Sequence, residues 1–183
     1  FATLPREEVR VISTAEPHVC RESVQYVEDV LDVTQGKLGM GFSCGSDDMP
    51  ALLMGNTLFG GSSNSKLFLN VREKLSLCYY ASSLYHRQKG LITVSSGVEF
   101  ADFQPAYEEI LSQLQALRQG QLEPWELDAA KGVLRSAYAA MEDSQGRLEN
   151  FWLGQAIESR SDSPEDLSRE MEETSAERIF RAM

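Results

Sequence analysis

Arg72 and Tyr79 are the two side chains of this 183-residue sequence whose types and spacing most clearly suggest chemistry. They lie seven residues apart in the stretch 58–80, LFGGSSNSKLFLNVREKLSLCYY. A guanidinium carries five N–H donors in a fixed fork and a phenol carries one O–H donor, so both can bind carboxylate or carbonyl oxygen. Simpler interpretations stay open, because Arg72 could pair with Glu73 or another carboxylate and Tyr79 could be a half-buried strand residue.

The usual catalytic motifs are missing from the sequence. His18 and His86 are the two histidines, and neither belongs to an H-E-x-x-H motif or its inverted form H-x-x-E-H. A catalytic zinc site normally needs three protein ligands, so we expect no metal site in this chain; His18, Cys20 and Glu22 form at most an incidental surface trio. There is no G-x-S-x-G nucleophile elbow and no phosphate-binding loop.

The elements around the pair follow from capping and periodicity. Asp47 or Asp48 caps a helix with Pro50 in its first turn, and Gly60 and Gly61 end it. A substrate contact by Gly60 and Gly61 is the minority interpretation. A second helix begins at Ser62 or Ser63, with one apolar face that comprises Leu67, Phe68, Val71 and Leu75.

The rest of the chain predicts a sheet followed by helices. Glycines alternate with apolar residues over 37–42, which indicates a strand, and the runs 77–85 and 91–98 predict a hairpin. Helices are predicted from Asp102 to Gly120, from Pro124, from Ser144, from Ser163 and near Thr174, and Trp125 and Trp152 are expected to pack in the helical layer. The order strand, helix, helix, strand, strand, helices predicts an α+β fold: a two-layer sandwich in which helices cover one face of a mostly antiparallel sheet. We expect a single domain over residues 1–183, sheet-rich over 20–98 and helical over 102–183.

The charge is strongly acidic and unevenly distributed. The net charge is −11: residues 1–98 carry 10 acidic and 9 basic residues, net −1, and residues 99–183 carry 18 acidic and 8 basic residues, net −10. Such a chain is repelled by phosphates, so we expect neither nucleic acid nor an anionic membrane as a partner. Lys66, Arg72, Lys74, Arg87 and Lys89 against Glu73 make a local excess of +4, either a solvated basic face or a surface that accepts acidic peptides.

Cysteine use and hydropathy suggest a soluble protein from a reducing compartment. Cys20, Cys44 and Cys78 are odd in number and widely spaced, which disfavours a disulfide framework and points to the cytoplasm or another reducing compartment. No run of about 18 apolar residues occurs. Because the chain lacks an initial Met and stops within a helical pattern, we expect a domain cut from a longer polypeptide.

The stretch 60–80 resembles the noncatalytic half of pitrilysin-type, inverted-zincin metallopeptidases, a class that includes mitochondrial processing peptidases and bacterial processing proteases. The similarity comprises the glycine and serine loop, the Ser65-Lys66-Leu67-Phe68 helix start, Arg72-Glu73-Lys74 and Tyr79. Ser76 and Cys78 stand where the family usually has glycine and alanine. The order of elements over most of the chain agrees as well.

The resemblance implies a division of labour between two homologous halves. The partner half, in the same polypeptide or on a second subunit, holds zinc with H-x-x-E-H; the zinc-free half forms one wall of the chamber for the peptide substrate. In active members the zinc-free half supplies an arginine and a tyrosine, matched here by Arg72 and Tyr79, to the substrate or transition state. The alternative is a catalytically inactive pseudo-peptidase or assembly module with the same fold; either way, we expect this domain alone to be inactive.

Overall fold

The sheet of the computed structural model, which describes residues 23–183, has three antiparallel strands. These are β1 (Gly36–Ser43), β2 (Tyr80–His86) and β3 (Leu91–Val98), in the order β1-β3-β2, so that β3 is central. β2 and β3 form the predicted hairpin through the short 3₁₀ turn η2 (Arg87–Lys89). The first hairpin strand begins at Tyr80 rather than at the predicted Leu77.

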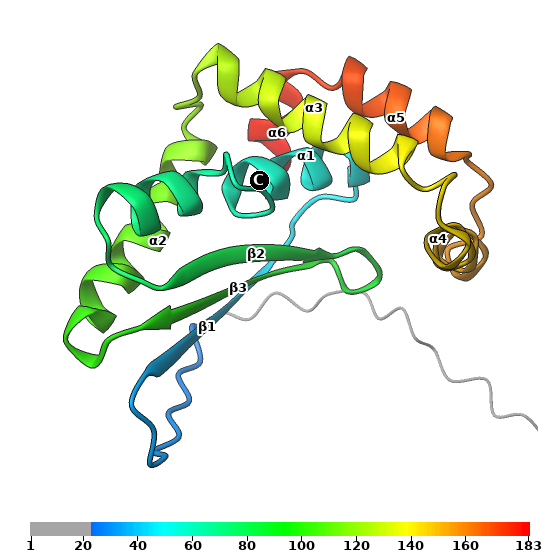
Figure 1. The fold of residues 1–183 in the computed structure, drawn as a ribbon. Helices are drawn as coiled ribbons and strands as arrows, with labels where there is room; N and C mark the ends of the chain where they lie inside the picture. The colour runs from blue at the N-terminus through cyan, green and yellow to red at the C-terminus, as the bar shows by residue number, and fades with distance from the viewer. Residues whose placement is uncertain (1–22) are drawn as a thin grey trace, which may run out of the picture.

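The two faces of the sheet differ because side chains alternate along each strand. Buried or half-buried side chains on one face pack under the helices: Leu38, Met40 and Phe42 of β1, Ala81 and Ser83 of β2, and Ile92, Val94, Ser96 and Val98 of β3. Mostly small or polar residues occupy the opposite face: Lys37, Gly39, Gly41, Ser43, Tyr80, Ser82, Leu84, His86, Leu91, Thr93, Ser95 and Gly97. We call this the open face, since no helix of residues 23–183 lies across it (Figure 1).

The helices form the second layer, as predicted. α1 (Met49–Phe59) is buried on nearly all sides, because it lies between the sheet and the outer helices. The other elements are η1 (Leu67–Lys74), η3 (Phe100–Asp102), α2 (Phe103–Arg118), α3 (Pro124–Ala139), α4 (Gln145–Ile157), α5 (Pro164–Glu173) and α6 (Ala176–Ala182). α3 and α5 run side by side over α1. α2 lies at the end of the sheet opposite the β2–β3 turn (Figure 1). The α+β class and its element order are therefore confirmed.

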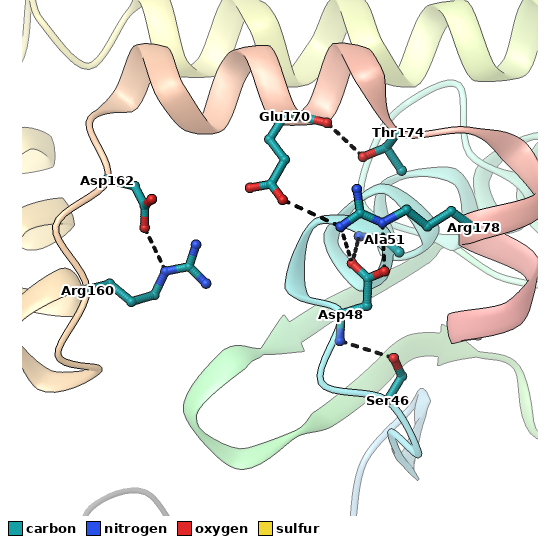
Figure 2. A network of polar contacts seen from close by, with 8 residues as sticks. All are labelled: Ser46, Asp48, Ala51, Arg160, Asp162, Glu170, Thr174 and Arg178. Carbon is teal, nitrogen blue, oxygen red and sulfur yellow. Dashed lines mark hydrogen bonds and ion pairs between the residues drawn. The ribbon is translucent and has the colours of Figure 1, made fainter.

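Asp48 joins the N-terminus of α1 to the last two helices. Its carboxylate accepts the Ala51 amide as the N-cap of α1, and it also receives two hydrogen bonds from Arg178 of α6, at 2.7 and 2.8 Å. Arg178 in turn reaches Glu170 of α5 (Figure 2). Burial alone raises the pKa of Asp48, but the bonds from Arg178 and Ala51 outweigh it and hold the pKa below its usual value.

Some predicted details are wrong. Residues 23–35 belong to no strand, although we expected sheet-rich structure from residue 20; their apolar side chains, among them Val27 and Val30, are exposed. Trp125 and Trp152 are about half exposed instead of packed, because each lies on the outward side of its helix. Among residues 23–183, none of the helices combines the length and apolar character needed to cross a bilayer.

Candidate functional site

Arg72 lies on η1, which is a π-helix rather than the predicted α-helix. The Leu75 amide donates to the Asn70 carbonyl at 3.1 Å, five residues back. Leu67 and Val71 are buried as predicted, but Leu75 is 45% exposed because the wider turn moves it off the apolar face. The helix also begins at Leu67, later than the predicted Ser62 or Ser63.

Two polar contacts attach η1 to the outer helices. Lys66, just before η1, donates to both carboxylate oxygens of Glu126 on α3, at 3.0 and 3.3 Å, and each side chain is only 8% exposed. The same carboxylate accepts the Glu123 amide at the start of α3. Asn70 donates to Gln113 of α2 at 2.8 Å. The helix that carries Arg72 is thus fixed by groups 43 and 60 residues away in sequence.

A left-handed residue turns the chain from η1 back to the sheet. Ser76 has φ 53°, its amide donates to the Arg72 carbonyl, and the Leu77 amide donates to the Val71 carbonyl. Glycine adopts this conformation most easily, which explains the usual glycine of the resembling family here. The turn returns the chain to Tyr79, whose amide donates to the Gly97 carbonyl of β3 at 2.8 Å.

The turn brings Arg72 and Tyr79 together, although the contact involves the backbone of Tyr79. The Arg72 Nε donates to the Tyr79 carbonyl at 3.0 Å, and Nη1 lies 2.9 Å from a Glu73 carboxylate oxygen. The guanidinium carbon also lies 4.8 Å from the centre of the Phe68 ring. The simple pairing of Arg72 with Glu73 therefore exists, but it uses only one side of the guanidinium fork.

Tyr79 and Tyr80 are placed very differently. Tyr79 is 76% exposed, so it is not a half-buried strand residue, and its hydroxyl has no partner among the described residues. Tyr80 lies on the open face over Gly97, and its hydroxyl is 3.2 Å from the Ser95 Oγ. Of these two phenols, that of Tyr79 is the one without a hydrogen-bond partner among the described residues.

Gly60 and Gly61 allow the loop after α1 to pack closely. The Gly60 carbonyl accepts a hydrogen bond from the Ser83 amide of β2 at 2.9 Å. A Cβ on Gly60 would lie 2.6 Å from that amide, and one on Gly61 would lie 2.9 Å from Asn56. The predicted helix end is confirmed, because both amides donate to the Asn56 carbonyl. Gly60 is buried, and the substrate contact stays a prediction.

Other reactive groups near the pair are few. Burial raises the pKa of the Cys78 thiol despite the nearby Ser96 and Arg72, so it is a poor nucleophile at neutral pH. No cluster of three His, Cys, Asp or Glu side chains able to hold a metal occurs within residues 23–183. The trio His18, Cys20 and Glu22 lies outside the described residues.

The predicted basic surface is not continuous. Lys66 is buried against Glu126, and Arg87 pairs with Glu158 of α4 at 2.6 Å. Lys74 and Lys89 are exposed. We predicted Lys66 as a surface charge. Its ion pair with Glu126 was not predicted, because a local sequence pattern does not indicate a partner 60 residues away.

Helices cover one face of a three-stranded antiparallel sheet, and Arg72 and Tyr79 lie where the π-helical segment returns to that sheet. Residues 1–134 match the Peptidase M16 inactive domain, and the chain belongs to this family. It is 37% identical to "Probable inactive metalloprotease YmfF" of Bacillus subtilis (strain 168), over 97% of this chain and 43% of that protein. It is 23% identical to "Uncharacterized zinc protease YmxG" of the same strain, over 81% of this chain and 38% of that protein.

Solved structures agree on the fold. The peptidase M16 inactive domain from Pseudomonas fluorescens superposes with a TM-score of 0.73 at 21% identity, over 84% of this chain and 38% of that one. The chain spans less than half the length of the two Bacillus subtilis relatives.

Proposed function

We propose that this domain is the zinc-free half of a peptide-degrading or processing metallopeptidase. It forms one wall of the substrate chamber and supplies Arg72 and Tyr79 to the active site on the homologous, zinc-binding half. The observation that carries the proposal is the exposed phenol of Tyr79, 76% accessible, on a backbone that Arg72 fixes. An aromatic side chain on a fixed backbone that the described residues leave uncovered is suited to contact a second surface.

The two side chains fit the charge that develops during peptide hydrolysis. A tetrahedral intermediate places negative charge on the former carbonyl oxygen, and a phenol O–H or a guanidinium N–H in a water-poor site stabilises that oxyanion. The Nε of Arg72 fixes the Tyr79 backbone and Nη1 pairs with Glu73, so Nη2 is the nitrogen left without a partner among the described residues to hold a substrate carbonyl or carboxylate.

Within residues 23–183 the donor set fits zinc poorly, and the proposal assigns the metal to the partner half. His86, the histidine within the described residues, bonds to Thr93 at 2.9 Å and has no carboxylate or thiol cluster around it. Zinc in the partner half would polarise the scissile carbonyl and activate water. The name of YmxG, "Uncharacterized zinc protease", supports a zinc site in the partner half.

The open face of the sheet supports the role of a chamber wall. Across its three strands, Gly39 of β1 and Ser82 of β2 lie on either side of Ser95 of β3. Gly41 and Leu84 lie on either side of Thr93 in the same way. Short side chains leave room above the sheet for a peptide, and serine and threonine hydroxyls can hydrogen-bond to it.

A second candidate function is a catalytically inactive pseudo-peptidase or assembly module. The name of YmfF, the 37% identical relative, favours it. The rest of the parent chain discriminates between the two: an H-x-x-E-H motif in the preceding half supports a peptidase, and its absence supports the assembly module.

Substitution of the pair in the full-length parent protein tests the proposal. Tyr79→Phe and Arg72→Ala are expected to lower kcat/KM for peptide cleavage by roughly 100- to 1000-fold, the typical effect of losing one oxyanion donor, with zinc content unchanged. Tyr107→Phe is the matched control, because it removes a phenol that lies on α2, away from the open face, and that bonds only to Tyr26 among the described residues. Wild-type rates in both site variants would overturn the assignment of the pair.

A further inference from the structure

α4 is the least attached helix among residues 23–183. It lies beyond the tip of the β2–β3 hairpin, apart from the helices that cover the sheet (Figure 1). No other helix or strand of the described chain packs extensively along it. Its main links are the partly buried Phe151, which reaches the core, and the ion pair between Arg87 and Glu158 just after its C-terminus.

One side of α4 is apolar and uncovered. Trp152, Leu153 and Ile157 are 44%, 56% and 48% exposed. At about 100° per residue these three side chains fall within an arc of about 140° on the helix, together with Ala156. We call these four residues the α4 apolar face. A strip of this kind on a helix is typical of a surface that packs against another protein surface.

The inner side of α4 gives the helix little stabilisation from its own domain. Gln155 is 1% exposed, and neither its amide nitrogen nor its amide oxygen has a partner among the described residues. A buried amide without hydrogen bonds is unfavourable. An unpaired amide on the inner side and large apolar side chains on the outer side leave α4 weakly stabilised by the described part of its domain.

We propose that the α4 apolar face docks against the homologous half of the parent protein. YmfF is more than twice as long as the part that this chain matches, so such a protein contains a second half large enough to cover α4. A second copy of this chain fits less well, since two copies with net charge −11 repel each other. This inference takes its partner from the proposed function but requires no activity from it.

Photocrosslinking in the full-length parent protein tests the proposal directly. Leu153 is replaced by the photoreactive residue p-benzoylphenylalanine, and crosslinked peptides are identified by mass spectrometry after irradiation. The expected result is a crosslink within one chain to a peptide of the homologous half. Crosslinks confined to this domain, its first 22 residues included, crosslinks between two chains, or no crosslink would each overturn the proposal.

The same substitution at Arg147 is the matched control. Arg147 is exposed on α4 but lies about 120° around the helix from Leu153, so we expect its crosslink to the other half to be several-fold weaker. Equal yields at both positions would overturn the assignment of this face. Since crosslinking needs no turnover, its failure is distinguishable from failure of the proposed function, which the Tyr79→Phe rates measure.

Discussion

The buried ion pair between Lys66 and Glu126 predicts a large loss of stability when only one of its two charges is removed. Lys66→Met keeps a side chain of similar length but removes the ammonium, which leaves the Glu126 carboxylate buried with only the Glu123 amide as a partner. Removal of one member of a buried pair typically costs about 3–5 kcal/mol, because the remaining charge is not compensated. For a chain of this size that corresponds to a fall in Tm of about 6–20 °C.

The double variant Lys66→Met/Glu126→Gln separates the charge effect from the packing effect. A neutral glutamine can still accept the Glu123 amide, so no uncompensated charge remains, and we expect its free energy of unfolding within about 1 kcal/mol of the wild type. Lys74→Met, on the exposed side of η1, controls for the change from lysine to methionine.

Urea titration and thermal unfolding of the four proteins provide the measurement. The expected order of stability is wild type and Lys74→Met first, the double variant close behind, and Lys66→Met far below. If Lys66→Met loses less than about 1 kcal/mol, or if the double variant is as unstable as Lys66→Met, the reasoning from buried charge is refuted.

Two further predictions concern stability. Ser76→Gly is expected to raise the free energy of unfolding by about 0.5–1 kcal/mol, because relief of the left-handed strain exceeds the entropy gained by the unfolded chain. Ser161→Gly is the control: this exposed position has no positive φ, so glycine there should not raise the free energy of unfolding. Asp48→Asn keeps an N-cap but loses the charge that pairs with Arg178, at a cost of about 1 kcal/mol at pH 7, and Asp48→Ala loses about 1 kcal/mol more. Because the folded pKa of Asp48 is lowered, the contribution of the pair is complete above about pH 4 and is lost as the pH falls through the folded pKa. Unfolding titrations at pH 7 and in acid check this; a difference between wild type and Asp48→Asn that persists in strong acid would contradict it.

The sequence predicted the fold from local signals with a clear physical origin. Asp48 and Gly60 mark the ends of α1, the run 91–98 predicts a strand of the hairpin, and the structure confirms each of them. Arg72 and Tyr79 could be placed near each other because one helix, one turn and one strand start lie between them.

What the sequence did not reveal depends on long-range contacts. The π-helical turns of η1 depart from the α-helical periodicity used to predict them, so Leu75 was assigned to the wrong side. The partner of Lys66 is 60 residues away, and no local pattern identifies it. Trp152 was expected to pack because aromatic residues in helices usually do; the contacts that would cover it are not made by the described residues of this domain.

The π-helical winding of η1 also bears on how this segment can vary between relatives. Lys66 at one end and Tyr79 at the other are both anchored, to α3 and to β3 respectively, so the number of residues between them is fixed by the wider turns. Deletion of one residue would rewind the helix and rotate Arg72 by roughly 100° away from the Tyr79 carbonyl. Homologues should therefore accept replacements of exposed residues in this interval far more readily than insertions or deletions.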